Sequence, residues 1–426
     1  MIIHVVQPGE TINAIAEQYD ITPERLISDN DIQSPDNLVV GETLVIVYPE
    51  QVYAVREGDT LSGIAEAHGV SVMQLLRNNP RLSDQRYIYP GEEIIISYTD
   101  DKIMAISTNG YAYPFIDRQL LRKTLPFLTY LTIYSYSFTA DAEIVDINDM
   151  DIIALSKQYG VAPVMMLTAL SVNQTEEINI IHSILISEEK QELFIENVIA
   201  ILRRKGFYGV NINTPYLYPQ DRDSYLAFIT RFTDRVTKEG YQIFITLSLS
   251  PFEIMTDTIY SRLEYARLEQ LVAGTVFISY DWGYSIGMPS GSIAFSSVRN
   301  LLEYMASQIP PELITFGIPS IGYVWTLPYE PGFSRGQAIS YNSVLELARD
   351  LGVAIQYDDI TKSSYFQYTL GDEYFVQFKD ARSIEAYTGL VPELGLNGIG
   401  IWNIMYFFAQ MWLVINSQYD IEKLPL

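Results

Sequence analysis

The sequence contains no cysteine and only three histidines, His4, His68 and His182, which lie far apart. The lack of cysteine excludes a disulfide framework, a thiol nucleophile and a thiolate metal site. Scattered histidines are expected to be ordinary core or surface residues, because a metal site needs several ligands close together. We therefore expect neither a metal nor a cofactor.

Positive charge is also scarce. The chain has 27 Lys and Arg residues against 52 Asp and Glu residues, a formal net charge of −25. This charge repels phosphate backbones and anionic lipids, so nucleic acid and membrane surfaces are not expected as partners. No run of about 18 apolar residues occurs, so we expect no membrane span. The N-terminus lacks the basic and long apolar regions of a secretory signal.

What the chain has is length, apolar residues and an internal repeat. Its 426 residues are 48% hydrophobic, which fits two or three folded domains. The segment from His4 to Ala16 returns between Tyr53 and Ala65, 49 residues later. Each copy predicts strand, helix, helix and strand, with a threonine before the first helix as its cap. We expect two tandem βααβ modules, residues 1–49 and 50–98.

Both copies carry the pattern G-[DE]-T-[IL]-x-x-I-A and resemble the LysM module, which binds N-acetylglucosamine polymers such as peptidoglycan and chitin. In that family the glycan lies between the first strand–helix loop and the loop before the last strand. The resemblance implies first walls of Gly9, Glu10, Thr11 and Ile12 in one copy and Gly58, Asp59, Thr60 and Leu61 in the other. The second walls are residues 37–40 and Tyr87, Ile88, Tyr89 and Pro90. The pattern also fits a plain turn and helix cap, and the first copy lacks equivalents of Tyr87 and Tyr89.

Residues 99–426 alternate apolar, β-rich runs with amphipathic helical segments. Eight such runs predict an α/β fold, a (β/α)₈ TIM barrel. The expected strands are 103–107, 130–136, 161–168, 209–213, 243–248, 275–280, 314–318 and 398–402. The seventh connection is long enough for a small α+β insertion at about 331–382. It is expected to hold a helix over 341–351 and short strands over 353–356, 365–368 and 374–378.

The motifs of this region resemble those of family 18 glycoside hydrolases. Residues 279–284 are similar to the sixth-strand motif Y-[DE]-W, and residues 317–329 to the seventh-strand motif G-I-P-x-Y-G-Y-x-W. Segments 380–384, 398–402 and 408–412 complete the set. Together with the two modules, the chain resembles in particular the LysM-bearing spore-cortex N-acetylglucosaminidases of endospore formers.

The resemblance implies substrate-assisted hydrolysis. In that family a glutamic acid protonates the glycosidic oxygen, and a neighbouring aspartate positions the acetamido group that attacks the anomeric carbon. The fourth strand there reads roughly D-G-x-x-x-D-x-E. Here Tyr208 and Asn213 occupy the two aspartate positions, Asn211 occupies the position between them that is also acidic in the family, and Pro215 occupies the position of the glutamate.

This catalytic motif is therefore degenerate. No carboxylate remains between Phe207 and Gln220, and Asp221 and Asp223 open the following helix, some turns away. We expect the barrel to have lost glycosidase activity, because proline cannot donate a proton and asparagine cannot offset positive charge.

Other binding residues of the family are retained and are expected near the strand ends, where barrel ligands bind. Trp402 matches the tryptophan that lies under the sugar, and flat aromatic rings suit a pyranose face. Trp325 fits core packing as well as a sugar contact. The candidates are Tyr280, Asp281, Trp282, Trp325 and Trp402.

Three functions stay open at this point. The first is a glycan-binding protein with an inactive barrel. The second is a working glycosidase with a non-standard acid, such as Asp281 acting through water. The third is a structural spore component whose barrel binds spore-coat proteins. All three place the protein in the spore cortex or coat, or in the cell envelope, without a classical signal peptide.

Overall fold

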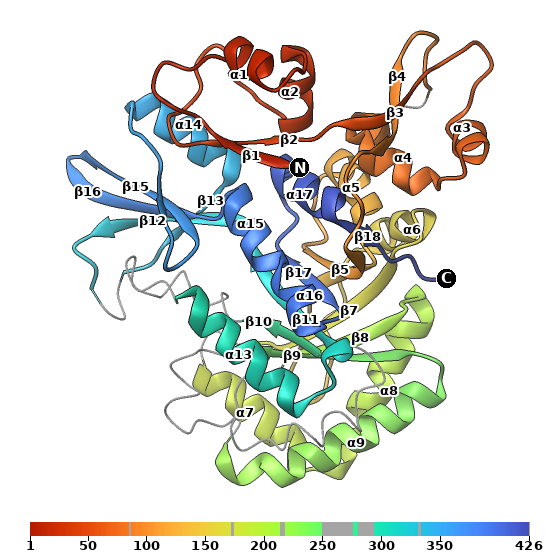
Figure 1. Cartoon of the computed structure of the whole chain (residues 1–426). Helices are drawn as coiled ribbons and strands as arrows, with labels where there is room; N and C mark the ends of the chain where they lie inside the picture. The colour runs from red at the N-terminus through yellow and green to blue at the C-terminus, as the bar shows by residue number, and fades with distance from the viewer. Residues whose placement is uncertain are drawn as a thin grey trace.

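The computed structural model describes residues 1–84, 87–171, 174–213, 218–248, 276–279, 294–330 and 334–425. Two small modules lie at one end of a larger barrel (Figure 1). Module 1 consists of β1 (Ile2–Val5), α1 (Ile12–Gln18), α2 (Pro23–Asn30) and β2 (Thr43–Ile46). Module 2 consists of β3 (Pro49–Ala54), α3 (Leu61–His68), α4 (Val72–Asn78), η1 (Pro80–Asp84) and β4 (Glu93–Tyr98). The two strands of each module pair antiparallel, which confirms the βααβ prediction.

Helix caps explain where the first helix of each module begins. The Thr11 hydroxyl oxygen accepts a hydrogen bond from the Ala14 N–H at 3.2 Å, and Thr60 accepts one from the Gly63 N–H at 3.0 Å. Such a bond satisfies a backbone donor that has no partner inside the helix. Each module also has an apolar core of its own.

The larger body is a closed barrel of eight parallel strands, as predicted. In chain order they are β5 (Met104–Ala112), β6 (Tyr130–Phe138), β7 (Ala162–Ala169), β8 (Gly209–Asn213), β9 (Gln242–Ser248), β10 (Val276–Ser279), β11 (Ile314–Pro319) and β17 (Gly398–Trp402). Each strand pairs with the next, and β17 closes the barrel by pairing with β5. A short strand, β18 (Tyr419–Ile421), extends the sheet beside the start of β5.

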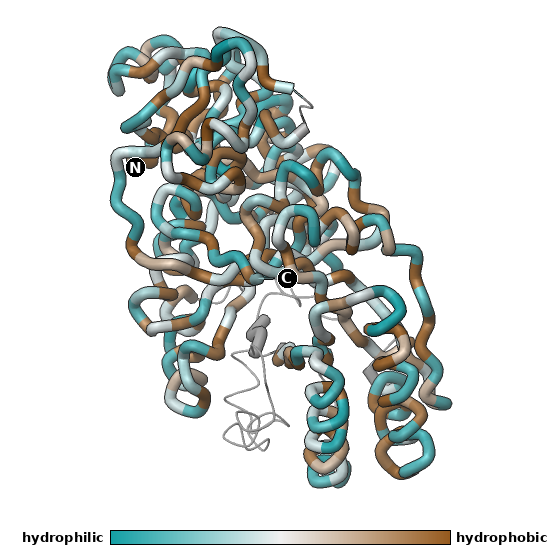
Figure 2. The backbone as a smooth tube through the Cα atoms, turned by 90° about the vertical axis from the view of Figure 1, so that its right-hand side faces the viewer, coloured by the Kyte–Doolittle hydropathy of each residue, from teal (hydrophilic) through white to brown (hydrophobic). Residues whose placement is uncertain are grey.

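Helices surround this barrel. The described ones are α5 (Arg118–Thr124), η2 (Leu125–Phe127), α6 (Met150–Gln158), α7 (Gln174–Leu185), α8 (Glu188–Lys205), η3 (Pro219–Asp221), α9 (Arg222–Lys238), α13 (Phe295–Gln308), η4 (Pro311–Leu313), α15 (Ala381–Thr388), α16 (Leu390–Leu394) and α17 (Ala409–Gln418). The long helices are amphipathic: α8 buries Phe194, Val198 and Leu202, while Arg203 and Arg204 are exposed. Figure 2 shows the resulting alternation of hydrophobic and hydrophilic residues along the helices.

The insertion in the seventh connection is an antiparallel sheet with one helix. Its order is β13-β12-β16-β15-β14. The elements are β12 (Ile321–Leu327), β13 (Gln337–Ser340), α14 (Tyr341–Leu351), β14 (Gln356–Asp358), β15 (Ser363–Leu370) and β16 (Asp372–Phe378). The expected start near residue 331 was wrong, because β12 already pairs with β13 and β16. The strand expected over 353–356 instead begins at Gln356.

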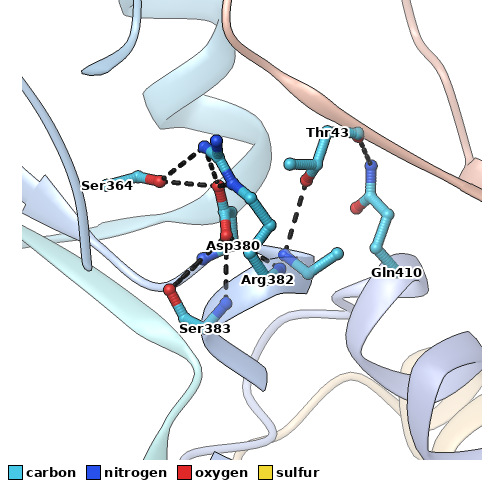
Figure 3. Close-up of polar contacts among 7 residues, drawn as sticks. Thr43, Ser364, Asp380, Arg382, Ser383 and Gln410 are labelled. Carbon is cyan, nitrogen blue, oxygen red and sulfur yellow. Dashed lines mark hydrogen bonds and ion pairs between the residues drawn. The ribbon is translucent and has the colours of Figure 1, made fainter. Parts of the chain in front are cut away.

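Polar contacts fasten module 1 to the barrel (Figure 3). Asp380 caps α15 by accepting hydrogen bonds from the Arg382 and Ser383 N–H groups at 2.9 and 3.2 Å. Its other carboxylate oxygen lies 2.6 Å from an Arg382 guanidinium nitrogen. Thr43 of β2 accepts the Ala381 N–H at its hydroxyl and the Gln410 amide at its carbonyl, at 3.4 and 3.3 Å. The family-like segment 380–384 therefore serves this junction.

Module 1 also contacts the insertion through its loop between α2 and β2. The Ile355 N–H donates to the Val40 carbonyl at 2.8 Å, and the Arg349 Nε donates to the Asn37 carbonyl at 2.9 Å. Gly41 has a φ of +87°, and a Cβ there would lie 2.1 Å from the Ile355 carbonyl oxygen. Only glycine fits both the conformation and the space.

Module 2 meets the barrel on the side of α4. The Asn416 side-chain amide donates to the Asn78 side chain at 2.8 Å. Arg77 is 7% exposed and donates to the Asn416 side chain and the Pro126 carbonyl, each at 3.3 Å. Burial lowers the pKa of Arg77 to about 10.

Glu42 provides a test of the module 1 junction. It is 3% exposed, and its carboxylate accepts the Val39 N–H at 3.1 Å. Burial raises its pKa from 4.5 to about 7. Folding raises the pKa of Glu42, so the folded state favours the protonated carboxyl group. The contribution of Glu42 to the free energy of unfolding is therefore complete below about pH 4.5 and is lost as the pH rises through 7.

We predict that Glu42→Gln, which keeps an acceptor for Val39, removes this loss, up to about 3 kcal/mol. Denaturant unfolding should show the parent losing stability between about pH 5 and pH 8 and the variant losing less. Glu17→Gln, an exposed change in the same module, is the control and should keep the parent's pH dependence. An unchanged loss in Glu42→Gln would show that another group causes it.

Gly41 of module 1 and Gly91 of module 2 make the same backbone hydrogen bond within their modules and provide a second prediction. Both have positive φ, +87° and +91°, but a Cβ at Gly91 would meet nothing within 4 Å. Alanine should cost about 1–2 kcal/mol at each from backbone strain. We predict that Gly41→Ala costs at least about 1 kcal/mol more, because its methyl group overlaps the Ile355 carbonyl. Equal unfolding free energies for the two variants would contradict the close contact.

Candidate functional site

The carboxyl ends of the barrel strands form a mouth, the place where ligands of this fold bind. Trp402, the last residue of β17, lies there half-buried. Its ring meets those of Tyr111, Tyr113 and Tyr134 edge-on, with centroids 5.6, 6.3 and 5.3 Å away. The first two strands thus hold the Trp402 ring in place.

The rim of the mouth is also aromatic. Phe115 is 74% exposed and stacks on Tyr113, with ring centroids 5.3 Å apart and planes 18° apart. Burial raises the pKa of Tyr134 to about 12. Its hydroxyl group therefore stays protonated at neutral pH and can donate a hydrogen bond.

Below the rim, uncharged polar side chains form a layer inside the barrel. The Thr246 hydroxyl donates to the Asn211 amide oxygen at 2.9 Å, and the Thr132 hydroxyl donates to the Asn109 amide oxygen at 2.8 Å. The Tyr111 hydroxyl shares this network, and burial raises its pKa. All five groups are neutral at physiological pH, so the layer carries hydrogen bonds without charge.

Asn213 ends β8 just above this layer and is 7% exposed. Its amide oxygen is buried and accepts no hydrogen bond within the described part of the chain. A buried acceptor without a partner costs free energy unless a ligand or water satisfies it. Asn213 is therefore placed to accept a hydrogen bond from a ligand in the mouth.

Tyr208 does not lie at the mouth. It precedes β8, at the amino ends of the strands, and packs with Tyr130, Val164 and Phe244. Because Tyr208 precedes the amino end of the fourth strand, the first acidic position of the motif lies at the opposite end of the barrel from the mouth. Tyr208 is thus a packing residue.

Four of the predicted site residues lie outside the described part of the structure: Pro215, Tyr280, Asp281 and Trp282. Their suggested roles remain predictions from the sequence.

Trp325 was expected among the sugar-binding residues, and the structure contradicts this. It is 0% exposed and belongs to β12 of the insertion, not to a barrel strand. Its ring packs against Tyr323 and Phe375, with centroids 5.6 and 6.2 Å away. Trp402 packs against the same cluster. Trp325 is therefore a core residue of the cluster against which Trp402 packs.

Glu177 is a further candidate that was not among the predicted site residues. It lies in the first turn of α7, which follows the third strand, and is half-buried. Burial raises its pKa to about 7, and its charge acts on Tyr134 at the mouth. The available signal was a carboxylate soon after a barrel strand. Its importance could not be recognised, because the pKa depends on packing between distant segments.

A histidine–carboxylate pair joins α7 to the connection after β8. His182 Nδ1 lies 2.7 Å from an Asp221 carboxylate oxygen, and Asp221 is 4% exposed. The Tyr218 hydroxyl donates to the Asn179 amide oxygen at 2.8 Å nearby. Asp221 is thus already paired, which disfavours it as a replacement acid, and Asp223 is exposed on α9.

In the modules, the first walls of the predicted grooves are held by their own side chains. The Glu10 carboxylate accepts the Gln7 N–H at 2.7 Å and lies 2.9 Å from His4 Nε2. In module 2 the Asp59 carboxylate accepts the Arg56 N–H and the Tyr53 hydroxyl, both at 2.8 Å. Because these acidic side chains form hydrogen bonds within the loops around Gly9 and Gly58, a ligand would contact the loop backbone instead of the carboxylates.

The remaining wall residues differ between the modules. Ile12 is 6% exposed and belongs to the core of module 1, whereas Leu61 is half-buried. Tyr87 and Tyr89 are each 60% exposed. Ile88, between them, is half-buried, and Pro90 is exposed. Module 2 therefore presents an aromatic second wall to solvent.

Neither a metal site nor a membrane span is found among the described residues. They contain no group of three or more His, Asp or Glu side chains that could hold a metal ion. They also include no helix with the length and apolarity needed to cross a bilayer.

Comparison with known proteins agrees with these features. Residues 162–406 match glycosyl hydrolases family 18, and residues 4–47 and 53–97 each match the LysM domain. The chain is 31% identical over 431 residues to the cortical fragment-lytic enzyme of Bacillus subtilis (strain 168), with 99% of each chain covered. It is 27% identical to the putative sporulation-specific glycosylase YdhD of the same strain.

Solved structures give the same result. The spore cortex-lytic enzyme SleL of Bacillus megaterium QM B1551 superposes with a TM-score of 0.80 at 27% identity, and 99% of each chain is covered. SleL of Bacillus cereus gives a TM-score of 0.81, also at 27% identity, with 99% of this chain and 98% of that chain covered. The chain therefore belongs to glycosyl hydrolases family 18, with two LysM modules ahead of its barrel.

Proposed function

We propose that this protein binds N-acetylglucosamine polymers of the peptidoglycan or chitin type in the spore cortex or cell envelope, and that its barrel has lost glycosidase activity. The proposed loss of glycosidase activity rests on one observation. In the sequence, Asn211 and Asn213 of β8 stand where the family motif has carboxylates, and Pro215 stands where it has the acid.

Chemistry explains why these replacements matter. Substrate-assisted hydrolysis needs a proton donor for the leaving oxygen and a negative charge beside the oxazolinium ion. Asparagine can hydrogen-bond an acetamido group but cannot supply that charge. Each loss typically costs about 10²–10³ in rate or more, so the two together remove most of the catalytic power.

Ligand binding does not need those carboxylates. The Trp402 ring can lie under a sugar face, and the Asn213 amide oxygen can accept an acetamido N–H. The Tyr134 hydroxyl adds a donor. The barrel thus keeps groups that recognise an amino sugar, and the LysM modules provide further contacts with the polymer.

The cellular location is proposed from the relatives. Full-length similarity to spore cortex-lytic enzymes supports the spore cortex or envelope. The scaffold hypothesis requires a surface that binds spore-coat proteins, and none of the features described above is such a surface. We therefore favour the glycan as the main partner.

Turnover is the direct test. We predict that the full chain releases products from chitin oligomers and cortex peptidoglycan at least about 10² times more slowly than the Bacillus subtilis cortical fragment-lytic enzyme measured alongside. The same preparation should sediment with insoluble chitin, which would show that it is folded and binding. Robust cleavage that Asp281→Asn abolishes would instead reveal a relocated acid.

One observation favours a second candidate function, a glycosidase that uses Glu177. A carboxyl group with a pKa of about 7 at the mouth has the protonation expected of a general acid. In that case cleavage should fall as the pH rises through 7, since the donor loses its proton, and Glu177→Gln should lower the rate about 10²-fold or more. Glu176→Gln, its exposed neighbour, is the matched control. Undetectable cleavage by the parent would rule this function out.

A further inference from the structure

The two LysM modules can be compared position by position, because the same hydrogen bonds recur in both. The Asn30 side chain bonds the Val45 N–H and carbonyl at 2.7 and 2.9 Å, and the Asn79 side chain bonds those of Ile95 at 2.9 and 2.8 Å. The Gly41 N–H donates to the Val6 carbonyl at 2.8 Å, and in the same way the Gly91 N–H donates to the Val55 carbonyl at 2.9 Å.

With this equivalence, residues 37–41 of module 1 correspond to residues 87–91 of module 2. Within these segments, residues 37–40 and 87–90 are the second walls of the predicted glycan grooves. The hydrogen bonds and contacts of the two segments can therefore be compared directly.

In module 1 the insertion occupies this wall. Two carbonyl groups, those of Asn37 and Val40, accept hydrogen bonds from Arg349 and Ile355. Gly41 is pressed against the Ile355 carbonyl, and Val39 is only 4% exposed. Figure 1 shows α14 of the insertion beside module 1. The polar and apolar groups that a glycan would use are already bound within the chain.

In module 2 the same wall faces solvent. A Cβ at Gly91 would meet nothing within 4 Å. Within the described residues the Pro90 carbonyl accepts no hydrogen bond from the chain, and Tyr89 is 60% exposed. The barrel contacts of module 2, through Arg77 and Asn78, lie on its α4 side.

We infer that module 2 alone provides the LysM glycan site, and that module 1 is an adaptor whose equivalent wall is used to dock on the barrel insertion. This inference rests on the proposed binding of N-acetylglucosamine polymers. The ligand class fits: a neutral glycan offers acetamido N–H groups to the Pro90 carbonyl and sugar faces to the exposed Tyr89 ring. A neutral polymer is also compatible with the strong negative charge of the chain.

Hydrogen exchange of the full chain, with and without the N-acetylglucosamine hexamer, can locate the site. We expect slower exchange in peptides that cover 56–61 and 87–92, and no change in peptides that cover 7–12 and 37–42. Protection of the module 1 peptides would overturn the inference while the proposed function stands. Protection in neither module would refute glycan binding by the LysM pair itself.

A matched pair of variants adds a binding measurement on the same full chain. Tyr89→Ala should weaken sedimentation with insoluble chitin about tenfold, because it removes the exposed ring. Asn37→Ala, an exposed change in the equivalent wall of module 1, should stay within about twofold of the parent. An unchanged affinity in Tyr89→Ala together with a loss in Asn37→Ala would assign the site to module 1.

Discussion

The pairing between β17 and β5 closes the barrel, and the ligand-facing side of the molecule depends on it. Gly398 pairs with Ser107, and a Cβ at Gly398 would lie 1.9 Å from the Ser107 carbonyl oxygen, so the two strands can approach only at a glycine. This pairing places Trp402, at the end of β17, against Tyr111 of β5. Without closure, the tryptophan would lose the aromatic support that orients its ring.

The replacement of acids in β8 is consistent with the rest of the barrel interior. Buried carboxylates need charged or multiple hydrogen-bonding partners to remain ionised. Asn211 instead bonds the hydroxyl groups of Thr246 on β9 and Tyr111 on β5. These neutral groups bond the Asn211 amide oxygen and offer no cation to a carboxylate, while the amide nitrogen is buried without a partner among the described residues. The change is therefore a property of the whole polar layer and not of one side chain.

The sequence was sufficient for those features that depend on local patterns. The βααβ repeat and the eight barrel strands each show up as a run of apolar residues with recognisable ends, and all were confirmed. The features that it could not reveal depend on contacts between distant segments. Trp325 is buried because β12 pairs with β13 and β16, and Gly41 meets Ile355 more than 300 residues later. Glu177 has its raised pKa for the same kind of reason.

The docked module 1 also determines how the molecule can sample a polymer. β2 ends at Ile46 and β3 begins at Pro49, so the two modules are joined without a long linker, and each is fastened to the barrel. A flexible linker would let the barrel search a sphere around the bound module, with an effective concentration set by linker length. Here the separation and orientation of the module 2 groove and the barrel mouth are fixed. If both proposed sites bind one glycan chain, they can do so only where the polymer presents its two contact points at the matching spacing.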